Sequence, residues 1–133
     1  MKIEKLQEYL NSSIVAWALT TNRVDTHYDL KTRIGIDNQN LQYVSVNKVG
    51  VMVRGEDPSW NFIFSITITK NGFDIDFFLD DAEEDIADSL DRDNYEHRKN
   101  VWAREYSVSL KTFDEVKEFL NKHVWKYDFG YFY

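Results

Sequence analysis

Residues 62–79 decide the fold, and they read FIFSITITKNGFDIDFFL. Larger apolar residues alternate with smaller or more polar ones from 62 to 69, and the alternation resumes from 73 to 79. A period of two is typical of β-strands. Asn71-Gly72 lies between the two runs, and this pair is the strongest short hairpin signal because both central residues of a type I′ turn need φ > 0. The sequence therefore predicts an antiparallel hairpin that turns at Asn71-Gly72.

The residues before the hairpin predict one helix and several strands. Apolar residues spaced by three and four predict an amphipathic helix over residues 3–10, ended by the cap-forming and turn-forming cluster at 11–13. The short apolar run at 14–19 is expected to be a buried strand. Clean alternation predicts a strand over 28–36. Residues 41–54 are valine-rich and form either one bent strand or two.

The residues after the hairpin predict two helices around one strand. A second helix begins at Asp80-Asp81, where carboxylates suit the positive end of the helix dipole, and its apolar stripe is Ala82, Ile86 and Leu90. Residues 91–100 are expected to be a loop or a frayed extension of that helix. A strand is predicted over 102–110, and the capping box at 112–115 begins a last helix.

These elements predict one α+β domain over residues 1–133. We expect an antiparallel sheet of about five to seven strands, with the N-terminal, middle and C-terminal helices packed mainly on one face. A parallel doubly wound sheet would need a regular alternation of strand and helix, which is absent from the sequence.

Composition and charge narrow the function classes. The chain has no cysteine, which excludes a disulfide scaffold, a thiolate zinc site and a cysteine nucleophile. The formal charge of −7 argues against direct binding of nucleic acid through phosphates. No apolar run is long enough to cross a bilayer, and no secretory signal is visible, so we expect a cytoplasmic protein without membrane contact. No motif implies a cofactor, and the three histidines lie in three different elements.

The acidity is concentrated in one segment. Residues 71–91 hold nine carboxylates and neither lysine nor arginine; without these nine the formal charge would be +2. At 100° per residue, five acidic residues of the second helix fall within about a third of its circumference. They are Asp81, Glu84, Asp85, Asp88 and Asp91. Such a row is either a solvated face that aids solubility or a surface that binds a basic groove built for nucleic acid.

Three further groups of residues are candidates for a site. Asp74 and Asp76 point to one face of a strand with Asp80 just beyond it, so they could hold Mg²⁺ or Ca²⁺, although a solvated strand face explains them more simply. Residues 125–133 hold six aromatic side chains. We expect this segment to be a last strand or strap across the sheet, or otherwise a contact surface that includes Tyr131 and Tyr133. Trp60 is likewise expected either to be buried against the sheet or to belong to a contact surface.

Three hypotheses for function follow. The first is a stand-alone, non-enzymatic inhibitor, monomeric or dimeric, that binds one basic protein partner such as a nuclease, a CRISPR effector or a toxin. It would bind through the acidic helix 81–91 and nearby acidic positions, including Asp74 and Asp76. The second is an adaptor that binds an extended client segment at a sheet edge or at the aromatic tail. The third is a small metal-dependent enzyme that uses Asp74, Asp76 and Asp80. In its architecture alone, the chain resembles secretion chaperones of this size, toxin-immunity proteins and phage anti-defence proteins.

Overall fold

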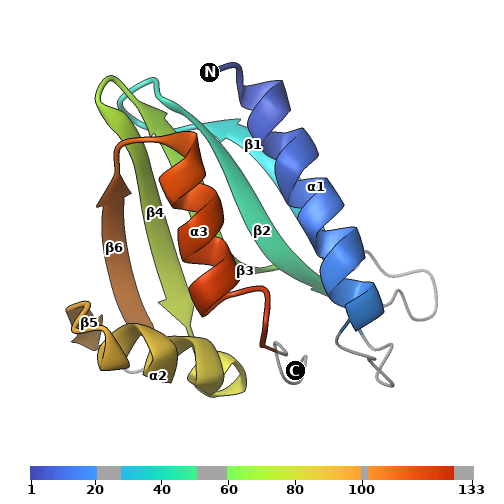
Figure 1. Ribbon diagram of the computed structural model, residues 1–133, viewed down its shortest axis with the longest axis vertical. Helices are drawn as coiled ribbons and strands as arrows, with labels where there is room; N and C mark the ends of the chain where they lie inside the picture. Colours follow the sequence, from blue (N-terminus) through green and yellow to red (C-terminus); the bar gives the residue numbers. More distant parts are fainter. Residues whose placement is uncertain (21–27, 51–59, 100–101, 128–133) are drawn as a thin grey trace.

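A computed structural model describes residues 1–20, 28–50, 60–99 and 102–127 (Figure 1). The elements are α1 (Ile3–Thr20), β1 (Tyr28–Ile36), β2 (Gln42–Gly50), β3 (Trp60–Thr69), β4 (Gly72–Leu79), η1 (Asp81–Glu83), α2 (Glu84–Arg92), β5 (His97–Lys99), β6 (Arg104–Leu110) and α3 (Phe113–His123). Within these residues the strands form one six-stranded antiparallel sheet in the order β1-β2-β3-β4-β6-β5. The α+β prediction is confirmed, and the strand number lies in the predicted range.

The hydrophobic core lies on one face of the sheet. Figure 1 shows α1 and α3 over this face, with α2 across the end of the sheet. Two rows of register partners on β2, β3, β4 and β6 form the floor of the core, and every member is buried: Val44, Ile66, Ile75 and Val108 in one row, and Val46, Phe64, Phe77 and Tyr106 in the next. The alternation of the strands places these side chains on the helix-covered face and their polar neighbours on the other.

The central hairpin is confirmed, but its turn differs from the prediction. Thr69 pairs with Gly72, so the two loop residues are Lys70 and Asn71. Neither has a positive φ, whereas Gly72 has a φ of 148°. The predicted type I′ turn at Asn71-Gly72 is therefore wrong. A Cβ atom at Gly72 would lie 2.2 Å from the carbonyl oxygen of Leu110 on β6, so the fold needs glycine here for close packing as well as for conformation.

Helix α1 is longer than predicted. It continues through the polar cluster at 11–13 and the apolar run at 14–19, so the expected helix end and the expected buried strand are both wrong. Leu10 and Trp17 are seven residues apart and both buried, because the apolar run continues the helical spacing of the first turns. The Trp17 Nε1–H donates to the carbonyl of Tyr127 at 2.7 Å, which fixes the end of α1 against the C-terminal segment. None of the helices in the described ranges is both long and apolar enough to cross a bilayer.

Two strands resolve questions that the sequence left open. β2 runs without a break to Gly50 and has a register irregularity between Val46 and Asn47, which supports one bent strand; residues 51–54 lie outside the described residues. β5 falls in the stretch that was predicted to be a loop or frayed helix. Its three residues are exposed, and it is held at the sheet edge by pairing with β6.

The start of the C-terminal part agrees with the prediction made from the sequence. The Thr112 side chain accepts a hydrogen bond from the Glu115 amide at 3.1 Å and caps α3 as predicted. Residues 124–127 form turns, and Trp125 packs into the core with its ring 6.2 Å from that of Phe64. The three described residues of the predicted strand or strap, 125–127, are not strand, and Trp125 is buried as that prediction expects; the rest of the segment, with Tyr131 and Tyr133, lies outside the described residues.

We expect Gly72→Ala to lower the free energy of unfolding by at least about 2 kcal/mol, because alanine would be strained at this φ and would collide with the backbone of β6. Urea titration followed by circular dichroism measures the loss. Asn71→Ala is the matched control: it is exposed, has no positive φ and should change stability by less than about 0.5 kcal/mol. Equal effects of the two substitutions would contradict this account of the turn.

Candidate functional site

A groove of about 610 Å³ lies between the start of α2 and the β5–β6 connection. Its lining combines carboxylates from one side with basic and aromatic side chains from the other. The lining residues are Leu79, Asp80, Asp81, Glu84, Asp88, His97, Lys99, Trp102, Ala103 and Arg104.

The acidic wall contains three of the five predicted helix residues. Asp80 begins the wall by accepting a hydrogen bond from the Ala82 amide at 2.8 Å, which caps the single turn η1. Asp81, Glu84 and Asp88 follow at spacings of three and four, so they project toward the same side. Asp81 and Glu84 are exposed, whereas Asp88 is half-buried. Asp85 is exposed but does not line the groove.

The opposite wall was not found by sequence reasoning. It consists of His97, Lys99 and Arg104 from β5 and β6, with Trp102 between the two strands. The Trp102 side chain is 78% exposed. Exposed tryptophan and arginine are the residue types that most often carry binding energy at interfaces. The available signal was the return of basic residues directly after the acidic segment, but nothing local showed that they face it.

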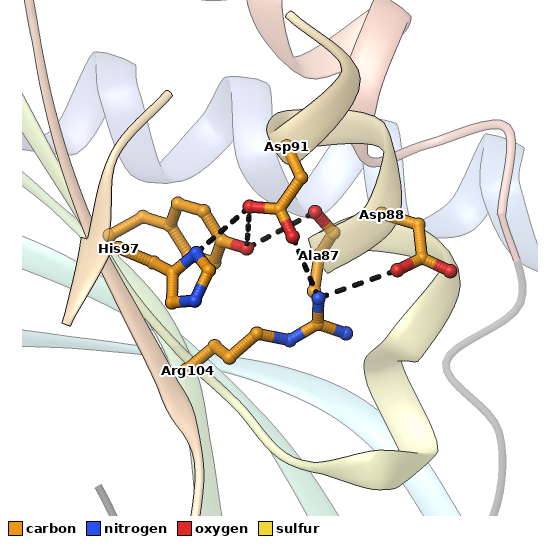
Figure 2. A network of polar contacts seen from close by, with 6 residues as sticks. Ala87, Asp88, Asp91, His97 and Arg104 are labelled. Atoms are coloured by element: carbon orange, nitrogen blue, oxygen red, sulfur yellow. Dashed lines mark hydrogen bonds and ion pairs between the residues drawn. The ribbon is translucent and has the colours of Figure 1, made fainter. Parts of the chain in front are cut away.

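The two walls are joined by the Asp91 carboxylate (Figure 2). Its Oδ1 accepts hydrogen bonds from the Tyr106 hydroxyl at 2.7 Å and from His97 Nδ1 at 2.9 Å. Its Oδ2 accepts from the Arg104 guanidinium at 2.8 Å, and the same guanidinium nitrogen lies 3.3 Å from Asp88 Oδ1. Arg104 therefore bridges two successive carboxylates of α2 from β6.

These contacts set the ionisation of the network. Partial burial by itself would raise the pKa of Asp91, but the hydrogen bonds from Tyr106 and His97 and the charge of Arg104 hold it below its ordinary value. Burial and the hydrogen bond to Asp91 raise the pKa of Tyr106, so the phenol keeps its proton. Asp91 is thus a charged acceptor surrounded by donors.

The fold interrupts the acidic row that the sequence predicts. The segment contains no lysine or arginine of its own, yet Arg104 neutralises its C-terminal end at Asp88 and Asp91. Within the described residues, Asp81, Glu84 and Asp85 make no ion pair. The concentrated negative charge is therefore limited to the first two turns, beside the open groove.

Asp74 and Asp76 lie elsewhere, on the face of the sheet that the helices leave uncovered. Each accepts a hydrogen bond from a serine of β6: Asp74 from Ser109 at 2.7 Å and Asp76 from Ser107 at 2.6 Å. Asp80 is engaged in capping η1. In the described parts of the chain, no group of three acidic or histidine side chains is arranged to hold a metal ion.

The structure also places Trp60 and two of the three histidines. The Arg33 guanidinium lies 3.6 Å from the centre of the Trp60 ring, so Trp60 already takes part in a cation–π contact. His97 belongs to the groove, and His27 lies outside the described residues. His123 Nδ1 lies 2.8 Å from Ser89 Oγ, and its Nε2 lies 3.2 Å from Asp93 Oδ2. Because Ser89 and His123 are 5% and 2% exposed, this Ser–His–Asp set has no access for a substrate and serves to join α2 to α3.

Comparison of the chain with protein-family models, with curated proteins and with solved structures finds no match. The geometry of the α+β fold and its groove is therefore the basis for a functional proposal.

The buried His123 gives a pH-dependent stability. Burial lowers its pKa below the ordinary 6.5, with Lys122 and Lys126 acting in the same direction and Asp93 opposing them. Below pH 6.5 the unfolded chain takes up this proton more readily than the folded one, so the contribution of His123 is present at pH 7.5 and is lost as the pH falls. We expect the difference in unfolding free energy between the wild type and His123→Gln to shrink between pH 7.5 and 5.5.

Urea titrations of both proteins across that range measure the difference. Ser89→Ala is the control, since it removes the hydroxyl contact but keeps the imidazole and so retains most of the pH dependence of the wild type. A difference between the wild type and His123→Gln that stays constant with pH would contradict the assignment.

Proposed function

We propose that the protein is a stand-alone, non-enzymatic inhibitor that binds one basic protein partner in the groove beside α2. The observation that supports the proposal is the arrangement of the open groove: the exposed carboxylates of Asp81 and Glu84 lie on one wall, and the exposed Trp102 lies between the strands opposite. Carboxylates select a basic partner by charge, and a central aromatic side chain supplies apolar contact area.

The contacts inside the groove support a preference for cationic side chains. Arg104 shows that the carboxylates of α2 can hold a guanidinium between them, at 2.8 Å from Asp91 and 3.3 Å from Asp88. The Asp81 and Glu84 carboxylates are one to two turns nearer the start of the helix. An incoming arginine or lysine would meet there a similar arrangement of oxygen acceptors in a more exposed place.

The class of partner follows from charge complementarity. Proteins that act on nucleic acids carry basic surfaces that contact phosphates, and a row of carboxylates can occupy such a surface and release its counterions as a phosphate backbone does. Blocking that surface inhibits the partner without any catalytic step. A phage protein directed against a CRISPR or similar nuclease and an immunity protein directed against a toxin are both consistent with this mechanism.

The double variant Asp81→Lys, Glu84→Lys should lose the partner while keeping the fold. Affinity purification from the source cells, with washes at low and high salt and identification by mass spectrometry, measures retention. We expect the wild type to retain one basic protein at low salt and to release it at high salt, because salt screens exposed charge pairs. The variant should retain at least about tenfold less of that protein.

The matched control is Asp114→Lys, Glu118→Lys, which changes the net charge equally at two exposed carboxylates of α3 outside the groove. If both double variants lose the partner equally, net charge rather than the groove determines binding. If neither loses it, the groove is not the binding site.

A second function is supported by the edge strand β1. Among the described strands it pairs only with β2, so residues 29–36 have an edge that no described strand covers. Ile34 and Ile36 are 41% and 63% exposed on this strand. A free edge with apolar side chains fits the addition of an extended client strand, as in an adaptor.

In the same purification, Ile36→Lys tests the adaptor function. A client that adds a strand should survive high salt and should be lost from Ile36→Lys, because a lysine on an edge disfavours pairing. Leu19→Lys, an equally apolar exposed position on α1, is the control and should retain the client. A salt-resistant client that is retained by both variants counts against strand addition at β1.

A further inference from the structure

A second hollow, of about 310 Å³, adjoins the groove at the ends of β2, β3 and β4. The two share Asp80, which lines both. The cavity is lined by Lys48, Trp60, Asn61, Phe62, Phe78, Asp80 and Glu83. Its volume is at the lower limit for a small-ligand pocket and fits a single side chain.

Two of the three charged groups of the cavity, Lys48 and Glu83, are deeply buried. Lys48 Nζ lies 3.3 Å from Glu83 Oε2, and the two side chains are 3% and 4% exposed. Asp80 lines the same cavity three residues before Glu83. The described lining residues thus hold two carboxyl groups and one ammonium group, which leaves this lining one cation short of neutrality when both carboxyl groups are ionised.

A proton makes up the difference. Burial raises the pKa of Glu83 to about 8, and the neighbouring Asp80 carboxyl adds to this effect, while the charge of Lys48 opposes it. At neutral pH a proton held by the carboxyl pair thus stands in for the second cation. A bound cation in the same place would displace that proton.

The walls suit a flat cation. Trp60, Phe62 and Phe78 are aromatic, and Phe62 is partly exposed at the cavity. Aromatic faces attract guanidinium groups, and the Trp60 ring already holds Arg33 at 3.6 Å. A guanidinium is planar, is weakly hydrated and can bind a carboxylate through two parallel hydrogen bonds, so it matches aromatic walls and a carboxyl pair better than an ammonium does.

We propose that this cavity is a binding site for one arginine side chain, held between its aromatic walls and the carboxyl groups of Asp80 and Glu83. The inference deepens the proposed function, on which it rests, by making an arginine of the basic partner the residue that enters next to the acidic groove. Entry of the guanidinium releases one proton from the carboxyl pair to solvent, and the charge of the cavity stays balanced.

Titration calorimetry of the full chain with Nα-acetyl-L-arginine methylamide tests the site without the partner. We expect one site with a dissociation constant of about 1 mM, as befits so small a ligand. Apparent affinity should rise roughly tenfold per pH unit from pH 6 to 7 and level off above pH 8, and comparison of two buffers of different ionisation enthalpy should show release of about one proton at pH 7. The neutral isostere Nα-acetyl-L-citrulline methylamide should not bind.

Glu83→Gln keeps the shape of the side chain but cannot ionise, so it should weaken arginine binding at pH 8 at least tenfold and abolish the pH dependence. Asp85→Asn, an exposed carboxylate outside the cavity, should leave both unchanged. The proposal is overturned if arginine fails to bind the wild-type protein at pH 8.5, if citrulline binds equally well, or if an acidic probe such as Nα-acetyl-L-aspartate binds instead.

The two proposals can fail separately, because their variants differ. Arginine binding with no effect of Asp81→Lys, Glu84→Lys on partner capture supports the cavity and removes the groove mechanism. Loss of partner capture without arginine binding supports the groove and removes the cavity site.

Discussion

The polar contacts that attach α2 to the sheet converge on one carboxylate, that of Asp91, beside the buried Ile86, Ala87 and Leu90. Three donors from β5 and β6 converge on it, from Tyr106, His97 and Arg104. Hydrogen bonds to a charged group are stronger than neutral ones, and the phenol keeps its proton because its pKa is raised. A nine-residue helix with repelling carboxylates would not be stable by itself in water, so α2 exists because the sheet holds it.

How much of the fold could be predicted depended on how local each signal is. The hairpin of β3 and β4 was predictable because strand alternation and a turn pair lie within 18 residues, although the glycine proved to be needed for its contact with β6 as well as for its φ. Residues 14–19 were misread because a short apolar run fits a buried strand and a helix equally well; only docking of Trp17 against Tyr127 decides between them. β5 carries no pattern of its own, since its three exposed residues are strand only through pairing with β6.

The candidate site was half predictable for a related reason. Helical spacing alone places Asp81, Glu84 and Asp88 on one side of a helix, and the structure has them in one groove. Their partners come from the order β4-β6-β5, in which β6 pairs with β4 after the chain has passed through α2 and therefore brings Arg104 beneath the helix. The contact between Lys48 and Glu83, which are 35 residues apart in the sequence, also depends on the order of the strands. A count of charges within one segment cannot show that cations from distant strands neutralise its carboxylates, because the order of the strands in the sheet decides which residues meet.

Which carboxylates are paired with cations, and which are not, bears on function. The fold pairs several carboxylates of this region with cations: Glu83 with Lys48, Asp88 and Asp91 with Arg104, and Asp93 with Lys122. It gives no ion pair, within the described residues, to Asp81, Glu84 or Asp85 at the start of the same helix. Repulsion among these three is present in the free protein and is relieved when a cation binds beside them. In the proposed mode of binding, relief of this repulsion contributes to association with a basic surface. At Asp80 this region adjoins a cavity whose described lining holds one carboxyl group more than it has cations.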